Sequence, residues 1–370
     1  MNQAAPKLRI LVAPLDWGLG HATRCIPIIR ELLAQNVEVI LAADKRPYEL
    51  FAKEFPELEI LRLPGYTILY PRERKMVRGI IAQSPRILWS AISEHRSLRE
   101  LIRRKKIDAV ISDNRFGLFS RRIPSIYLTH QISISMPTRL RWLAGLVRHM
   151  HRLAIERYTE CWIPDFAGAE NLSGSLSHGC PLPVNASFVG PLSRFRRGTG
   201  GTEEFEVIAV LSGPEPQRTI FEEKVVEQLK SFRAKSLIIR GMPELTQRMR
   251  ISDSLTVISH LDSSSLCAAI RSSTVVIARP GYSTLMDLAV LGKPAILVPT
   301  PGQTEQEYLA EALEEQGRFV IQNQNSLSIE TAFKEAVRRG GYGHLPPTEP
   351  LLTDAVNRLI TLAKARRSGS

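Results

Sequence analysis

The sequence predicts an α/β protein with two doubly wound, Rossmann-like domains that face a central cleft. Three observations lead to this prediction. Short apolar stretches alternate with amphipathic stretches of helical spacing, which is the pattern of βαβ units. This alternation stops at a segment rich in Gly, Pro, Ser and Arg, around residues 190–204, and then starts again. The length of 370 residues also exceeds one ordinary core.

The first domain is predicted over residues 1–195, with buried parallel strands joined by helices. Its expected strands are Leu8–Ala13, Val37–Ala42, Ile60–Leu63, Asp108–Asp113 and Pro124–His130. Its expected helices are Ala22–Gln35, one that begins at Asp44, and a long basic segment up to Lys106.

The second domain is predicted over residues 204–345, and its apolar runs repeat the same alternation. Its expected strands are Val207–Gly213, Lys235–Gly241, Leu255–Leu261, Thr274–Gly281 and Pro294–Pro299. Its expected helices are Thr219–Phe232 and Thr284–Leu291. An amphipathic stretch at about residues 350–365 is expected to form a last helix that packs back on the first domain.

Composition narrows the class of protein. Hydrophobic residues make up 44% of the chain and charged residues 23%, which is typical of globular proteins and not of disordered ones. No apolar run approaches the roughly 20 residues that span a bilayer, and the first residues do not resemble a signal peptide. The four cysteines are far apart, which favours buried thiols over disulfides or zinc. A cytoplasmic protein is expected.

The net charge of +12 suits an anionic membrane surface, a nucleic acid or an anionic substrate, although a solvated basic surface is the simpler alternative. Arginine is concentrated between Arg62 and Lys106. An aromatic content of 6% and the lack of an arginine–aromatic strand motif speak against a nucleic acid.

Two basic stretches that contain tryptophan suggest peripheral docking on the inner face of a membrane. The alternative is that their apolar residues belong to the core. The residues expected to supply apolar contact are Trp89, Trp142, Leu143, Leu146 and Val147.

The loop after the first strand is a candidate ligand site, because ligands of doubly wound sheets bind beyond the carboxyl ends of the strands. Gly18 and Gly20 allow close approach of the backbone, and the following helix offers unpaired N–H groups. His21, at the loop-to-helix junction, is a candidate base. The spacing Gly-x-Gly-His differs from a dinucleotide fingerprint, but Asp44 lies near the distance of its acidic residue, so this loop alone leaves a dinucleotide site open.

Asp113 follows a buried strand, so we expect its carboxylate at the same sheet edge as His21. A carboxylate on one imidazole nitrogen would fix the tautomer while the other nitrogen accepts a proton. His21 and Asp113 are therefore predicted to act as base and orienting acid, with capping of the next segment as the alternative for Asp113.

The segment Ala278–Leu313 carries the strongest signal for a ligand. A strand ends near Arg279, and a helix begins at Ser283 or Thr284, so that its N-terminus can bind a diphosphate. Asp287 lies one turn further on, where a carboxylate can accept hydrogen bonds from sugar hydroxyls.

This segment resembles the C-terminal signature of glycosyltransferase family 28, whose members include the peptidoglycan N-acetylglucosaminyltransferase of the lipid-intermediate step. The shared positions, in order, are Arg279, Gly281, Thr284, Asp287, Gly292, Pro294 and Pro299. The opening loop also resembles the Gly-x-Gly-His loop of the family. Leu211–Arg218 stands at the place of the family's glycine-rich loop, and Ser259–Ser263 at the place of its base-reading turn. Asp287 stands where the family usually has Glu, and Pro280 and Tyr282 replace small residues.

The resemblance implies a two-domain fold of the GT-B type and a role for each matched residue. On the donor, Asp287 would hold the ribose, the amides of Gly281, Tyr282 and Ser283 would face the diphosphate, the backbone of Leu261 would contact the uracil, and Gln306 and Glu307 would contact the sugar. Ser212, Gly213 and Arg218 would lie near the phosphates, and His130 and Gln131 on the acceptor side.

The expected function is metal-independent, inverting transfer of a sugar from a nucleotide sugar, UDP-linked on the resemblance, to an acceptor hydroxyl of a lipid, a lipid-linked sugar or a small metabolite. No cofactor is expected to be required, because no Asp-x-Asp motif is placed to hold a divalent ion. Arg279 or Arg218 would help to stabilise the leaving diphosphate. The alternatives are a nucleotide-sugar epimerase and a non-catalytic nucleotide-sugar-binding protein.

Overall fold

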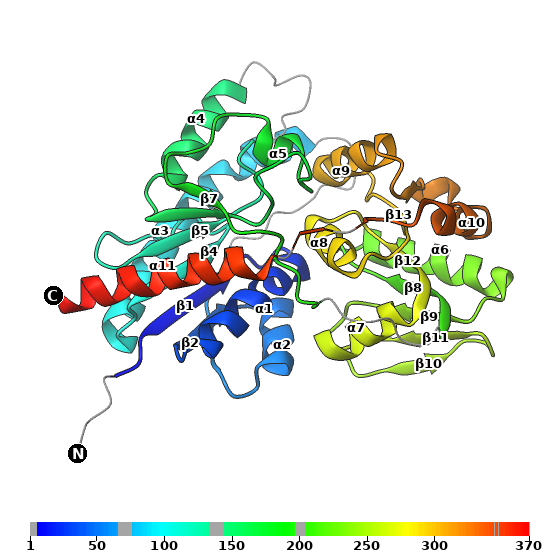
Figure 1. Cartoon of the computed structure of the whole chain (residues 1–370), viewed down its shortest axis with the longest axis horizontal. Helices are drawn as coiled ribbons and strands as arrows, with labels where there is room; N and C mark the ends of the chain where they lie inside the picture. Colours follow the sequence, from blue (N-terminus) through cyan, green and yellow to red (C-terminus); the bar gives the residue numbers. More distant parts are fainter. Residues whose placement is uncertain are drawn as a thin grey trace. The chain divides into compact units, whose positions relative to one another are not determined.

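The computed structural model describes residues 6–65, 76–133, 144–196, 204–343, 345–346 and 348–369, with side chains for all of them except residues 76–88. The chain divides into two compact units. Unit 1 comprises Met1–Trp17, Arg24–Leu192 and Pro347–Ser370, and unit 2 comprises Gly18–Thr23 and Ser193–Pro346. Each unit contains a seven-stranded sheet with helices packed against it (Figure 1).

The sheet of unit 1 is entirely parallel, in the order β3-β2-β1-β4-β5-β6-β7. Its strands are β1 (Arg9–Pro14), β2 (Glu38–Ala43), β3 (Glu59–Arg62), β4 (Ala109–Asp113), β5 (Ser125–Leu128), β6 (Glu160–Ile163) and β7 (Ala186–Phe188). The helices are α1 (Leu19–Ala34), α2 (Lys45–Glu54), α3 (Met76–Lys105), α4 (Ala144–Ile155), α5 (Ser175–His178) and α11 (Glu349–Ser368). The first turn of α1, up to residue 23, groups with unit 2. The strand order 3-2-1-4-5-6 is that of dinucleotide-binding folds.

Unit 2 repeats this order, as β10-β11-β9-β8-β12-β13-β14, with one antiparallel strand, β10, at the edge. Its strands are β8 (Phe205–Val210), β9 (Ser236–Ile239), β10 (Arg248–Arg250), β11 (Leu255–Ile258), β12 (Ser273–Ala278), β13 (Ala295–Leu297) and β14 (Val320–Ile321). The helices are α6 (Gln217–Phe232), α7 (Ser263–Arg271), α8 (Tyr282–Leu291), α9 (Thr304–Glu315), α10 (Ile329–Arg339) and the short η2 (Gln324–Ser326).

Apolar burial explains why these strands form. The residues of β4, β5 and β9 are buried throughout, as expected for parallel strands covered on both faces. The core of unit 2 joins strand residues such as Ile277 to helix residues such as Phe221 and Val225. The predicted fold class, of two doubly wound α/β sheets, is thereby confirmed.

The predicted elements are found within a few residues, with two differences that affect the site. Helix α1 begins at Leu19 and not at Ala22, so Gly20 and His21 belong to its first turn. Helix α8 begins at Tyr282, ahead of the predicted start. The strands β6, β7, β10 and β14 were not predicted, since each has only two to four residues, too few for a periodic pattern.

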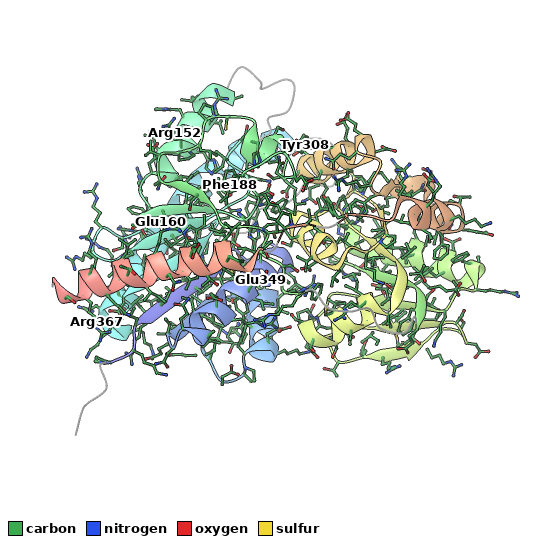
Figure 2. All side chains as sticks on the ribbon, viewed as in Figure 1. Arg152, Glu160, Phe188, Tyr308, Glu349 and Arg367 are labelled. Carbon is green, nitrogen blue, oxygen red and sulfur yellow. The ribbon has the colours of Figure 1, made fainter. Side chains whose placement is uncertain are left out.

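The C-terminal helix α11 packs on unit 1 (Figures 1 and 2). It begins at Glu349, and near its other end Arg367 donates to the carbonyl oxygens of Pro6 and Lys7, at 3.0 and 3.1 Å. The buried side of the helix is apolar and comprises Leu352, Ala355, Val356, Leu359, Ile360 and Ala363.

Candidate functional site

The topology of each sheet marks one position for a ligand. In a sheet of order 3-2-1-4, the connections from the two central strands leave in opposite directions, and a crevice opens beyond their carboxyl ends. In unit 1 these strands are β1 and β4, and in unit 2 they are β8 and β12. Most of the predicted site residues follow these four strands or lie on the helix that comes next. The exceptions follow the strands β5, β11 and β13, and they are His130, Gln131, Leu261, Gln306 and Glu307.

In unit 1, a buried ionic network lies at the carboxyl end of β4. Asp113, the last residue of β4, accepts a hydrogen bond from Arg24 Nε at 2.6 Å and a second, shorter one from Arg24 Nη2. Arg24 Nη1 also lies 2.8 Å from Nδ1 of His130, which follows β5. Cys25 Sγ lies 3.8 Å from Asp113 Oδ2. Arg24 was missed by the sequence analysis; the available signal was an arginine within an otherwise apolar helix face.

His21 lies in the first turn of α1, three residues before Arg24. Residues three and four apart lie on the same side of a helix, and Arg24 and Cys25 both reach Asp113. The pairing of His21 with Asp113 stays a prediction. On the proposed acceptor side, His130 is buried, and the N–H of Gln131 donates to Thr129 Oγ1 at 3.1 Å.

In unit 2, α8 begins directly beyond the carboxyl end of β12. Gly281 is its N-cap residue, in an extended conformation, and as a glycine it has no side chain with which to cap the first turn. The amides that open the helix, including those of Tyr282, Ser283 and Thr284, therefore carry the positive end of the helix dipole. Such a terminus suits a phosphate group.

Arg279, predicted to help bind the donor, is fully buried just before this turn. Its guanidinium donates to the carbonyl oxygens of Val298, Pro299 and Gln217, at 2.9, 3.0 and 3.1 Å, and to Gln324 Oε1. It also stacks on the ring of Phe221, 4.0 Å from the centroid. Burial lowers the pKa of Arg279 to about 9, so it remains a cation at pH 7. Direct contact with a phosphate would require some of these bonds to be exchanged.

Asp287 is buried one turn into α8. Its carboxylate accepts hydrogen bonds from Ser193 Oγ at 2.7 Å and from Arg194 Nε at 3.2 Å. Desolvation raises the pKa of Asp287 in spite of the opposing effect of Arg194. In this conformation Asp287 holds the segment that enters unit 2, and its predicted contact with ribose is untested.

The loop after β8 contains Ser212 and Gly213, and Gly213 has a φ of +112°, a conformation that favours glycine. Arg218, at the start of α6, pairs with Glu215 and Glu222, each at 2.6 Å. Two carboxylates therefore already balance this guanidinium. Leu261, half-buried, precedes the N-cap of α7.

Gln306 and Glu307 shape the turn before α9. Gln306 Oε1 accepts a hydrogen bond from the N–H of Thr300, and Glu307 Oε1 accepts one from the N–H of Gly302, both at 2.8 Å. Gln306 is buried, whereas Glu307 is exposed. Their predicted contact with the transferred sugar is untested.

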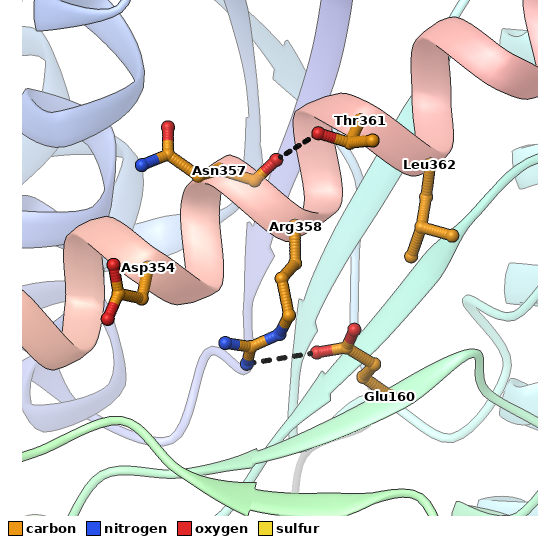
Figure 3. A pocket seen from close by; sticks show the side chains of 6 residues that line it. All are labelled: Glu160, Asp354, Asn357, Arg358, Thr361 and Leu362. Carbon is orange, nitrogen blue, oxygen red and sulfur yellow. Dashed lines mark hydrogen bonds and ion pairs between the residues drawn. The ribbon is translucent and has the colours of Figure 1, made fainter.

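A hollow of about 610 Å³ lies beside α11 in unit 1 (Figure 3). Its lining residues are Glu160, Asp354, Asn357, Arg358, Thr361 and Leu362. Within it, Arg358 lies 3.5 Å from Glu160, the first residue of β6. The hollow is thus at the amino end of that strand, opposite to the end at which doubly wound sheets bind ligands. We assign it no part in the candidate site.

The described residues form neither a metal site nor a membrane-spanning helix. No group of three or more His, Cys, Asp or Glu side chains is arranged to hold a metal ion in the part of the chain that the structure describes. Within the same residues, every helix is too short or too polar to cross a bilayer.

Comparison with known proteins identifies the class. Residues 199–339 match the model of the glycosyltransferase family 28 C-terminal domain. An uncharacterized glycosyltransferase of Methanosarcina acetivorans is 26% identical over 334 residues, covering 84% of this chain and 82% of the relative. A protein of Sinorhizobium fredii, the UDP-N-acetylglucosamine--N-acetylmuramyl-(pentapeptide) pyrophosphoryl-undecaprenol N-acetylglucosamine transferase, is 25% identical over 308 residues, covering 79% and 76%.

The crystal structure of Acinetobacter baumannii MurG shares the fold, with a TM-score of 0.53 and 14% identity, over 95% of this chain and 100% of that one. The protein is therefore a glycosyltransferase with the GT-B fold. Its residues 199–339 are similar to the C-terminal domain of glycosyltransferase family 28, and the chain resembles the MurG-type enzymes.

Proposed function

We propose that this glycosyltransferase moves a sugar from a UDP-linked donor to an acceptor hydroxyl, in one inverting, metal-independent displacement. The observation that carries the proposal is the position of the α8 N-terminus, which opens with Gly281 directly beyond the carboxyl end of the central strand β12, within the domain that matches family 28. The name of the Sinorhizobium fredii relative, which includes UDP-N-acetylglucosamine, supports a UDP-linked donor.

The proposed chemistry divides between the two units. In unit 2, the amides at Gly281–Thr284 bind the diphosphate and stabilise its charge as it leaves. His21 removes the proton from the acceptor hydroxyl, which attacks the anomeric carbon in line and inverts it. Asp113 holds the imidazole and stabilises the imidazolium. Asp287, Leu261, Gln306 and Glu307 complete the donor site, and His130 and Gln131 contact the acceptor.

The test of this proposal is the substitution His21→Ala. We expect turnover to fall by about two to four orders of magnitude, while affinity for UDP stays unchanged, because the base contributes to the chemical step alone. Asp44→Asn is the control. Asp44 is the acidic residue that a dinucleotide site would need, and here it pairs with Arg62 at 3.3 Å. Its substitution should leave transfer intact.

Turnover measurements with a panel of nucleotide sugars and a lipid extract separate the alternatives. Transfer that is unchanged in His21→Ala would remove this histidine from the role of base. Donor binding without transfer or hydrolysis would indicate a non-catalytic binding protein. Release of an altered nucleotide sugar without any acceptor would indicate an epimerase.

We also propose that unit 1 docks on the anionic inner face of a membrane, where a lipid or lipid-linked acceptor would be found. Trp89 on α3 is 73% exposed and Leu146 on α4 is 57% exposed, and exposed arginines accompany them on both helices. Val147 is half-buried, and the predicted contacts at Trp142 and Leu143 lie outside the described residues.

Flotation with liposomes tests this docking. We expect the protein to float with vesicles that contain anionic lipid, less so at high salt, and to float poorly when Trp89→Ser and Leu146→Ser are combined. Met249→Ser, which removes an exposed apolar side chain from unit 2, is the matched control. Equal flotation of both variants would contradict docking through unit 1.

A further inference from the structure

Three buried side chains from different segments of unit 1 meet, and the guanidinium of one of them, Arg24, contacts the other two. Arg24 comes from α1, Asp113 ends β4, and His130 follows β5. All three are at most 4% exposed. The guanidinium binds Asp113 through Nε and Nη2 and reaches His130 Nδ1 with Nη1, at 2.8 Å. One cation therefore links the carboxylate proposed to orient His21 to a residue proposed for the acceptor side.

The chemistry of arginine fixes the protonation of this histidine. A guanidinium has five N–H donors and no acceptor, and it stays protonated. The nitrogen 2.8 Å from Nη1 must therefore be the acceptor, so Nδ1 of His130 carries a lone pair. The single ring proton of the neutral imidazole is then on Nε2.

We propose that Arg24 is a positioning residue that holds His130 as the neutral Nε2–H tautomer while it clamps the Asp113 carboxylate. In this form His130 can donate a hydrogen bond to an oxygen of the acceptor, but it cannot take a proton from it. The role of base is left to His21. The part that concerns the acceptor rests on the proposed function, whereas the tautomer rests on geometry alone.

The groups around His130 have opposing effects. The cation of Arg24 disfavours a second positive charge on the ring, and the carboxylate of Asp113 favours it. The thiol of Cys25, on the same helix as Arg24, stays neutral, because burial first and then Asp113 raise its pKa. A protonated Nδ1 would point its hydrogen at an arginine N–H, so the neutral ring is the form that the contact at 2.8 Å allows.

Nitrogen-15 NMR of the intact wild-type protein tests the tautomer without any assumption about activity. His130→Gln identifies the signals of His130 by their disappearance. We expect a bare Nδ1 and a protonated Nε2 that stay unchanged from about pH 5.5 to 8.5, whereas histidine in the urea-unfolded chain titrates near about 6.5. An imidazolium that forms in the folded protein near that pH, or a proton on Nδ1, would overturn the proposal.

Arg24→Lys tests the positioning. Lysine keeps the charge but lacks the planar fork that binds a carboxylate and an imidazole together. We expect His130 to gain a pH titration, and the KM for the acceptor to rise about tenfold or more, while UDP affinity is retained as evidence of a folded unit 2. If His130 in Arg24→Lys still shows no titration, or if the acceptor KM equals that of the wild type, the role of Arg24 is contradicted. If glycosyl transfer itself fails, the wild-type NMR result still decides the tautomer.

Discussion

Replacement of Arg279 by methionine separates a structural role from a ligand-binding one. The guanidinium joins the end of β13, the start of α6 and Gln324, because its acceptors are the carbonyls of Pro299, Val298 and Gln217 and the side chain of Gln324. Methionine keeps an unbranched side chain as far as the position of Nε but lacks the guanidinium and supplies no donor. The substitution leaves several buried oxygens unsatisfied and removes the cation from the Phe221 ring.

The expected loss of stability follows from these contacts. Each hydrogen bond to a charged group contributes about 1.5–3 kcal/mol, but bonds that share one side chain are not additive. The burial of the cation offsets part of their sum, because desolvation disfavours the charge that Arg279 carries. We therefore expect a decrease of about 3–5 kcal/mol in the free energy of unfolding of unit 2, because several buried neutral oxygens lose their donor at once.

The positions of the tryptophans provide the assay. All four lie between residues 17 and 162, so tryptophan fluorescence follows the unfolding of unit 1, whereas far-UV circular dichroism follows both units. In urea, Arg279→Met should split the two transitions, with the circular dichroism change moved to lower urea. Arg250→Met, at an arginine whose side chain is 71% exposed, should change stability by less than about 0.5 kcal/mol. Unaltered unfolding of Arg279→Met together with lost UDP affinity would refute the structural role and assign the guanidinium to the donor.

Two further predictions concern single groups. Gly281→Ala should leave unfolding unchanged, because the φ of −74° suits alanine and the nearest atom to the added methyl is 4.0 Å away. If phosphates contact this backbone, the same substitution should weaken UDP binding about tenfold or more in calorimetry. Gly213→Ala, at a φ of +112°, is the control and should instead destabilise the protein by about 1–3 kcal/mol. Burial lowers the pKa of His151, so below about pH 6.5 the unfolded chain binds more protons than the folded one, and stability falls as the pH falls. In urea titrations between about pH 7.5 and 5.5, His151→Phe should lose less stability than the wild type, and an identical loss would contradict this account.

The fold was predictable because buried parallel strands leave a direct trace in the sequence. Runs such as residues 109–111 and 275–278 are continuously apolar, and polar or turn-forming residues follow them. The short strand β6 was missed because only four residues pair, and the burial of Trp162 depends on neighbours that are distant in the sequence. The pairing register of the strands and the position of the short edge strands depend on tertiary contacts, so the local sequence does not predict them.

The sequence predicts where the candidate site residues lie along the strands, but not which side chains bind them. Strand ends and the glycines beside them place Asp113 at the carboxyl end of β4 and Gly281 just beyond that of β12, as the structure has them. The sequence could not reveal that Arg24 binds Asp113, because the two are 89 residues apart, or that Asp287 accepts hydrogen bonds from the segment at Ser193. Such pairings depend on which loops the topology brings together, and a single sequence carries no record of that.

The return of the chain to unit 1 has a consequence for biosynthesis. Residues 193–346 interrupt unit 1, whose component α11 is synthesised only after the whole of unit 2. Until then the surface that receives Leu352, Val356 and Leu359 stays exposed, whereas unit 2 already has its entire sequence. Unit 1, which is begun first, is therefore completed after unit 2, and a chain truncated after residue 346 would have a complete unit 2 and an open, aggregation-prone unit 1.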